Sequence, residues 1–179
     1  MRIETQRLIL RHIVEADAED IYEYCKNPEV GPRAGWAPHT SIENTRELMA
    51  QVFISQPHIF GIIDSDNRMV GSIGFLPDPH RPETNSLMLG YALAQECWGK
   101  GYMTEAARAV VTYGFDTVGA SLLTSNTYDF NVASQKVLEH CGFEPEGMLH
   151  AGETRYDGET FDLKMYYLTR ERFELLRGR

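Results

Sequence analysis

The stretch SLMLGYALAQECWGKGYMTEAA at residues 86–107 constrains the fold most, because a strand pattern passes through a glycine turn directly into a helix pattern. Gly99 and Gly101 allow the backbone to approach a ligand closely, and the first N–H groups of a helix have no partner within the helix. Such a turn can bind a diphosphate, to which Lys100 and Thr104 add a cation and a hydroxyl. A purely structural turn of the same composition is the alternative. The spacing of the glycines excludes a Walker A loop and the dinucleotide fingerprint.

Hydrophobic periodicity predicts the other elements. The predicted strands are residues 3–11, 58–64, 69–76, 86–94, 122–127, 143–150 and 159–168. The predicted helices are residues 17–26, 41–55, 102–117, 132–140 and a closing helix capped by Thr169. This order predicts an α+β, or mixed α/β, fold with helices flanking a mostly antiparallel, twisted sheet of about seven strands.

Composition narrows the class of protein. A length of 179 residues without a linker or repeat predicts one domain, residues 1–179. The formal net charge of −9 argues against nucleic acid as a partner and suits a cationic substrate. The three cysteines are far apart, so we expect free thiols and no metal site. A charged N-terminus and the lack of a long apolar run predict a cytoplasmic protein that does not contact a membrane.

A second motif follows about thirty residues after the glycine turn. Residues 126–143 read NTYDFNVASQKVLEHCGF, a strand end followed by a helix that Gly142 closes. Asn131 suits the N-cap of this helix and Ser134 its third position, so capping alone would explain both residues.

Together the two motifs resemble the GNAT acetyltransferases, and in particular the Rim-type branch that acetylates protein N-termini. The resemblance extends over nearly the whole chain. It includes Thr5-x-Arg7-Leu8-x-Leu10-Arg11, Asn27-Pro28-Glu29-Val30, Gly71-x-Ile73-Gly74, Gly90-Tyr91, the WGKGYMTEA block and Asp157-Gly158.

The resemblance implies acetyl-CoA as cosubstrate and assigns residues to it. The pyrophosphate would bind the turn and the helix start, formed by Glu96, Trp98, Gly99, Lys100, Gly101, Tyr102, Met103 and Thr104. Glu96 departs from the usual Gln or Arg at the first position of this turn. The pantetheine arm would lie along Ala92, Leu93 and Ala94 and contact Asn131.

The same resemblance implies direct transfer of the acetyl group to an amine, with no covalent enzyme intermediate. Many relatives carry a tyrosine that protonates the thiolate at the position of Leu138, so Ser134 is the candidate acid here, with Asn131 beside it in the motif. A backbone N–H of Leu93 or Ala94 would stabilise the oxyanion. Met88 stands where many relatives have a carboxylate, so the expected base is missing. The candidate bases elsewhere are His39, His80, Glu83 and Asp129.

The acceptor is left open by the sequence. We expect Trp36, His39 and Tyr128 to contact it, and it is either a protein N-terminus or a small amine. A coenzyme-A-binding sensor without catalytic activity is the main alternative, because Met88 and Leu138 replace acid–base residues. A second alternative is a non-enzymatic scaffold in which the glycine turn is purely structural. Exposed strands near the end of the sheet could also pair two copies into a homodimer.

Overall fold

The computed structural model describes residues 1–178 and confirms the predicted α+β class. The strands are β1 (Arg2–Glu4), β2 (Ile9–Arg11), β3 (Ile59–Ile63), β4 (Met69–Pro77), β5 (Ser86–Leu93), β6 (Leu122–Tyr128), β7 (Glu144–Thr154) and β8 (Thr160–Thr169). The α-helices are α1 (Ala18–Cys25), α2 (Ile42–Met49), α3 (Tyr102–Tyr113), α4 (Val132–His140) and α5 (Arg170–Arg177). Hydrogen bonds join the strands in the order β1-β2-β3-β4-β5-β6-β8-β7. The β5–β6 pair is parallel, whereas β1–β2, β2–β3, β3–β4, β6–β8 and β7–β8 are antiparallel.

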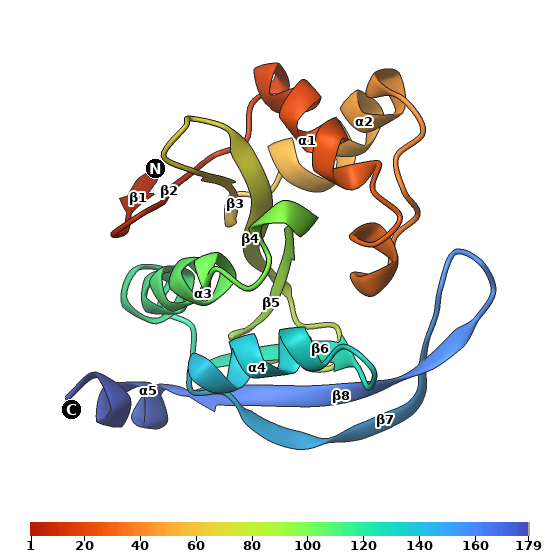
Figure 1. Ribbon diagram of the computed structural model, residues 1–179. Helices are drawn as coiled ribbons and strands as arrows, with labels where there is room; N and C mark the ends of the chain where they lie inside the picture. Colours follow the sequence, from red (N-terminus) through yellow and green to blue (C-terminus); the bar gives the residue numbers. More distant parts are fainter. Residues whose placement is uncertain (179) are drawn as a thin grey trace. The chain divides into compact units, whose positions relative to one another are not determined.

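Two compact units make up the described chain. The first comprises Met1–Gly74 and Tyr91–Ala106. In it, β2 pairs with β3 so that Leu10 lies opposite Ile62, and both side chains are completely buried. Helices α1 and α2 lie side by side (Figure 1). Where β4 meets the end of β5, the backbones approach so closely that a Cβ on Gly71 would lie 2.4 Å from the Ala92 carbonyl oxygen.

The second unit comprises Phe75–Gly90 and Ala107–Arg179. Its strand β6 runs parallel to β5 and antiparallel to β8. Helix α4 lies along β6 and β8 (Figure 1), and Tyr166 in β8 donates a hydrogen bond from its hydroxyl to Glu139 in α4. The fully buried Leu123 and Leu138 belong to the core of this unit. The long β7–β8 hairpin extends beyond the helix, as Figure 1 shows.

The structure corrects the predicted start of the chain. Residues 2–11 form two short strands rather than one, so the sheet has eight strands instead of about seven. The reason is a turn between them, in which the Thr5 N–H donates to the Leu8 carbonyl oxygen and the Thr5 hydroxyl accepts from the Leu8 N–H. A sequence pattern of alternating residues cannot distinguish a continuous strand from two strands that fold back on one another.

Two predicted helices are shorter than expected as regular α-helix. Ser41 caps α2 as predicted, but the α-helical bonding stops at Met49 and a π-helical turn continues over Ala50–Ile54. Similarly, α3 passes into a π-helical turn at Gly114–Val118, which ends at the left-handed Gly119. The hydrophobic period predicts that a segment is helical, but it does not distinguish these hydrogen-bonding patterns.

Candidate functional site

The glycine turn between β5 and α3 has the backbone geometry that the sequence predicts. Gly99 and Gly101 have φ values of +73° and +78°, a left-handed conformation that costs an L-residue about 1–2 kcal/mol. A Cβ on Gly99 would meet no atom within 4 Å, so this side of the backbone is open within the unit. The first helical hydrogen bond runs from the Glu105 N–H to the Gly101 carbonyl oxygen. The amides of Tyr102 and Met103 therefore precede the hydrogen-bonded helix, where an anion binds most readily.

Arg7 and Glu105 hold this turn in place. The Arg7 guanidinium donates from Nε to Glu105 Oε2 at 2.6 Å and from Nη1 to the Lys100 carbonyl oxygen at 2.8 Å. Thr5 adds a hydroxyl bond of 2.7 Å to Glu105 Oε1, and the Arg7 guanidinium lies over the Tyr102 ring. Burial would raise the pKa of Glu105, but these hydrogen bonds outweigh it and lower the pKa. We call these contacts the Arg7 brace; they fix the angle at which α3 begins.

The backbone just before the turn is already hydrogen-bonded in part. The Trp98 indole donates to the Leu93 carbonyl oxygen at 2.8 Å, and the Ala94 N–H donates to the Val70 carbonyl oxygen at 2.7 Å. Of the two amides expected as oxyanion donor, that of Ala94 is therefore occupied, and Leu93 is the remaining candidate. The neighbouring Cys97 thiol is buried, and burial raises its pKa, which does not favour a nucleophilic thiolate.

In the second unit, the start of α4 confirms the predicted cap. The Asn131 side-chain oxygen accepts a hydrogen bond from the Ser134 N–H at 3.2 Å, and Gly142 beyond the helix has a φ of +91°. Ser134 is half-buried one turn before Leu138, which is completely buried. Leu138 thus belongs to the core of this unit and has no proton to donate. Of the two candidate positions for the acid, only Ser134 has a hydroxyl group.

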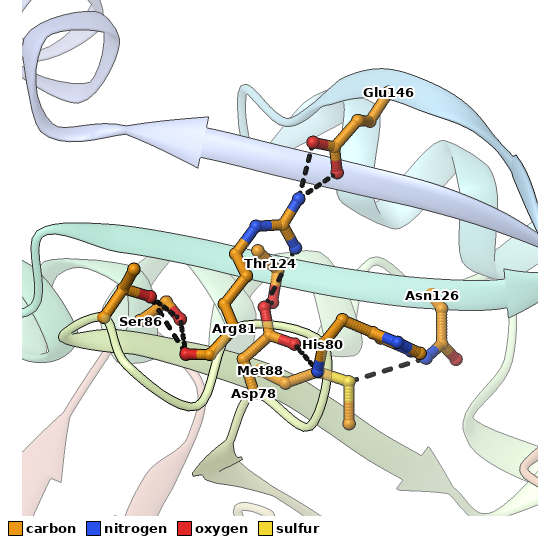
Figure 2. Close-up of polar contacts among 9 residues, drawn as sticks. Asp78, His80, Arg81, Ser86, Met88, Thr124, Asn126 and Glu146 are labelled. Carbon is orange, nitrogen blue, oxygen red and sulfur yellow. Dashed lines mark hydrogen bonds and ion pairs between the residues drawn. The ribbon is translucent and has the colours of Figure 1, made fainter.

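A buried carboxylate organises the loop between β4 and β5. Asp78, with 1% of its side chain exposed, accepts hydrogen bonds from the His80 N–H, the Arg81 guanidinium and the Thr124 hydroxyl (Figure 2). One Arg81 nitrogen, Nη2, also donates to both carboxylate oxygens of Glu146 in β7. Burial would raise the pKa of Asp78, but its hydrogen bonds outweigh burial and lower it. Asp78 is therefore a structural anion, and a poor proton acceptor at neutral pH.

The position where a base is expected has a thioether. Met88 pairs with Thr124 in the β5–β6 register, and its sulfur accepts a 3.5 Å contact from the Asn126 side-chain amide (Figure 2). Met88 and Asn126 are half-buried, and neither side chain can remove a proton from an amine. His80 is exposed in the adjoining loop, where only its backbone is fixed by Asp78.

The family model described as an acetyltransferase (GNAT) domain matches residues 7–144. The chain belongs to the GNAT acetyltransferase family. It is 32% identical to the uncharacterized N-acetyltransferase YoaA of Bacillus subtilis over 177 residues, which cover 95% of this chain and 97% of YoaA. It is 24% identical to the [ribosomal protein uS5]-alanine N-acetyltransferase of Escherichia coli, over 82% and 80% of the two chains. A GNAT acetyltransferase structure from Bacillus anthracis superposes with a TM-score of 0.82, 24% identity and coverage of 96% and 99%.

These findings confirm the resemblance, including the likeness to the Rim-type branch, and the assignment as an acetyltransferase. GNAT enzymes use acetyl-CoA. The residues predicted to bind it fall in both units: residues 92–104 belong to the first, and Asn131 and Ser134 to the second. Within residues 1–178, no cluster of His, Cys, Asp or Glu could hold a metal ion, and no helix has the length and apolarity to cross a membrane.

The predicted acceptor-contacting residues have different surroundings. His39 is buried in the first unit, where its Nδ1 lies 2.9 Å from the Thr45 hydroxyl and its ring packs on Trp36. Burial lowers the pKa of His39, so the ring is neutral at pH 7. Tyr128 ends β6 in the second unit and is 3% exposed, with its ring against Phe130 and Phe161.

Sequence reasoning missed the residues that support the site. Arg7 lies in a motif shared with the family, but its partner Glu105 is 98 residues away, so no local sequence pattern predicts the ion pair. The same holds for Asp78 and Thr124, which are 46 residues apart. Such pairs become visible only when strands bring distant segments together.

Proposed function

We propose that this protein moves the acetyl group of acetyl-CoA directly to a primary amine, either a protein N-terminal α-amine or a small-molecule amine. The observation that carries the proposal is the left-handed Gly99-Lys100-Gly101 turn at the start of α3, braced by Arg7. This turn supplies backbone donors for a diphosphate without a nucleotide-binding fingerprint. The roles of individual residues in both units are part of the proposal.

The cofactor would be held mainly by backbone. The amides of residues 99–104 would bind the pyrophosphate, and Lys100, which is exposed, would add a charge. Residues 92–94, with Leu93 as oxyanion donor, and the Asn131 amide would hold the pantetheine arm and the thioester. Glu96 and Trp98 would border the turn, and Glu96 would repel phosphate if it approached, which is consistent with recognition through the backbone.

In the reaction, the amine nitrogen attacks the thioester carbonyl carbon, the carbon–sulfur bond breaks, and the sulfur leaves as a thiolate. We propose that the Ser134 hydroxyl gives that thiolate a proton, because the other candidate position is the buried Leu138. The amine nitrogen loses its extra proton to water or to an exposed loop base such as His80, Glu83 or Asp129. His39 is a weaker candidate, since its Nδ1 already has the Thr45 partner.

The missing carboxylate at Met88 favours an acceptor that needs little help to become neutral. An α-amine with a pKa near 8 is about a tenth neutral at pH 7. A lysine amine with a pKa near 10.4 is about three orders of magnitude more charged than neutral at the same pH. The difference corresponds to about 3 kcal/mol. The likeness to the E. coli enzyme that is named for ribosomal protein uS5 alanine is consistent with an N-terminal acceptor. Trp36, His39 and Tyr128 would contact that acceptor.

A second candidate function is a coenzyme-A-binding sensor that no longer transfers acetyl groups. It is favoured by the hydrophobic residues at Met88 and Leu138. Retention of the half-buried Ser134 hydroxyl favours the enzyme instead. We further propose that both units act as one catalytic domain, that the protein works in the cytoplasm, and that two copies can pair as a homodimer through exposed strands. The net charge of −9 does not favour nucleic acid as a partner.

The decisive experiment measures thiol release from acetyl-CoA with a panel of free amines and peptides of varied N-terminal residue. Wild type, Ser134→Ala and a Lys136→Ala control would be compared, because Lys136 is an exposed residue of the same helix. Turnover that Ser134→Ala reduces by about 100-fold or more in kcat, as expected for a lost general acid, would support the proposal. Tight binding of acetyl-CoA without turnover of any amine would favour the sensor. Full activity of Ser134→Ala would remove Ser134 from the mechanism.

A further inference from the structure

The carbonyl oxygen at the end of β5 is bonded by a side chain from the turn that follows it. The Trp98 indole donates from Nε1 to the Leu93 carbonyl oxygen at 2.8 Å. Trp98 follows the helical turn Gln95–Cys97 and directly precedes the left-handed Gly99. A single side chain therefore ties the start of the glycine turn to the end of the strand, and both lie in the first unit.

The peptide group between Leu93 and Ala94 is held at both of its polar atoms. Its carbonyl oxygen accepts from the indole, and its N–H, which belongs to Ala94, donates to the Val70 carbonyl oxygen of β4 at 2.7 Å. A Cβ on Gly71 would lie 3.1 Å from the Leu93 Cα, so β4 also packs closely against this point of the chain. Rotation of the peptide group would break both hydrogen bonds, which therefore fix its orientation.

The indole lies on the same edge of β5 as the Leu93 N–H. In a trans peptide the carbonyl and the N–H point in opposite directions, so the Leu93 carbonyl points away from β4, towards which the Ala94 N–H donates. In an extended strand the N–H and the carbonyl of one residue point to the same edge. The Leu93 N–H thus also points away from β4, and this N–H is the donor that the proposed mechanism assigns to the oxyanion.

The indole ring is itself held in place. The Arg33 guanidinium lies 5.6 Å from the ring centroid, and Arg33 is paired with Glu29 at 3.2 Å. The Trp98 backbone N–H donates to the Gln95 carbonyl oxygen at 3.1 Å. These contacts restrict the ring although Trp98 is 38% exposed, so the indole is a rigid support for the end of β5.

We propose that Trp98 is a positioning residue for acetyl transfer. Its indole holds the Leu93 carbonyl so that the Leu93 N–H is aimed at the thioester oxygen, on which negative charge develops when the amine attacks. Such a donor stabilises the charge only when it lies about 2.7–3.1 Å from that oxygen, so a small rotation of the backbone slows the reaction. Trp98 neither gives nor receives a proton. This inference rests on the proposed acetyl transfer and adds a residue that acts through Leu93.

The experiment separates the indole hydrogen bond from the other contacts of the turn. Trp98→Phe removes the donor to Leu93 and keeps an aromatic ring for Arg33. As controls, Arg33→Gln keeps the donor and removes the cation over the ring, and Gln95→Ala removes the side chain that accepts from Asn27 at 2.9 Å. The measured quantities are kcat with a saturating amine and the calorimetric Kd for coenzyme A, which has no thioester oxygen.

We expect the kcat of Trp98→Phe to fall about tenfold, less than the loss of about 100-fold or more when an oxyanion donor is removed, because the Leu93 N–H is misaligned rather than lost. The Kd for coenzyme A should stay within about twofold of wild type, since the affected interaction forms in the transition state. Both controls should keep the wild-type kcat. An unchanged kcat in Trp98→Phe would overturn the proposal. Equal losses of kcat and of affinity for coenzyme A would do the same, because the indole would then only support the turn.

Amide hydrogen exchange tests the role of Trp98 without acetyl transfer. The Ala94 N–H belongs to the peptide group whose carbonyl the indole holds. Its exchange should be about tenfold faster in Trp98→Phe, the effect of losing a hydrogen bond of ordinary strength, and unchanged in both controls. Faster exchange confined to Trp98→Phe would support the hold on this peptide group even if the proposed acetyl transfer had failed. Exchange at the wild-type rate would reject it.

Discussion

Replacing Glu105 by glutamine would remove the charge at the centre of the Arg7 brace while keeping the shape of the side chain. Glu105 accepts from the Thr5 hydroxyl at 2.7 Å, the Arg7 N–H at 2.8 Å and Arg7 Nε at 2.6 Å. A glutamine oxygen can keep the first two bonds, but its NH₂ group would then face the Arg7 guanidinium, donor against donor. The variant therefore loses the ion pair and one charge-assisted hydrogen bond.

The magnitude follows from the exposure of the two partners. A hydrogen bond to a charged group contributes about 1.5–3 kcal/mol. Glu105 is 16% exposed, but the Arg7 side chain is 42% exposed, so solvent screens part of the interaction. We expect a loss of about 1–2 kcal/mol in the free energy of unfolding at pH 7, or about 2–8 °C in Tm for a chain of this length. The KM for acetyl-CoA should rise, because the brace fixes the turn.

The loss should depend on pH in a defined direction. Burial would raise the pKa of Glu105, but the bonds from Thr5 and Arg7 outweigh it, so the pKa is lower in the folded protein than in the unfolded chain. A carboxyl of this kind contributes stability above its unfolded pKa, and the contribution disappears as the pH falls through its folded pKa. The stability gap between wild type and Glu105→Gln should thus be complete at pH 7 and narrow below about pH 4.

Urea denaturation at several pH values measures the gap. Glu19→Gln is the matched control. Like Glu105, Glu19 lies in the first turn of a helix and interacts with its N-terminus, but Glu19 is exposed and has no contacts comparable to the Arg7 brace. If Glu105→Gln were as stable as the control, or if its deficit were constant from pH 7 to pH 3, the brace would contribute no charge-dependent stability.

Two further substitutions test the geometry around the site. Gly101→Ala should destabilise the protein by about 1–2 kcal/mol, because its φ of +78° is unfavourable for an L-residue. The variant should also bind acetyl-CoA more weakly in calorimetry; an unchanged affinity would show that this turn does not bind the cofactor. Asp78→Asn should cost about 2–4 kcal/mol at pH 7, because Arg81 and Thr124 lose a buried anion. Since its hydrogen bonds lower the pKa of Asp78 in spite of burial, this deficit should also disappear in acid. An unchanged Tm for Asp78→Asn at pH 7 would contradict the assignment of Asp78 as a structural anion.

Local chemistry explains why many predictions from the sequence succeeded. The alternation around Leu10, the N-caps at Ser41, Asn131 and Thr169, and the terminating Gly142 each depend on a few neighbouring residues. The glycine turn was predicted for the same reason, since left-handed backbone at Gly99 and Gly101 requires glycine wherever the chain folds. The family motifs combine these local requirements, which is why the GNAT assignment could be made from the sequence.

Other features depended on contacts between distant segments. The turn at Thr5 that splits the first strand is tied to Glu105, and no pattern within residues 2–11 contains that partner. Whether His39 is a reactive base or a buried ring depends on Thr45 and on the packing around it.

The sequence by itself determined most of the elements, the glycine turn and the family, because each is encoded by backbone preferences over a short span. Only the tertiary structure decided which distant side chains meet: Glu105 with Arg7, and Asp78 with Thr124. The physical reason is that the energy of an ion pair or a buried polar group depends on distance and desolvation, which the order of residues along the chain does not specify.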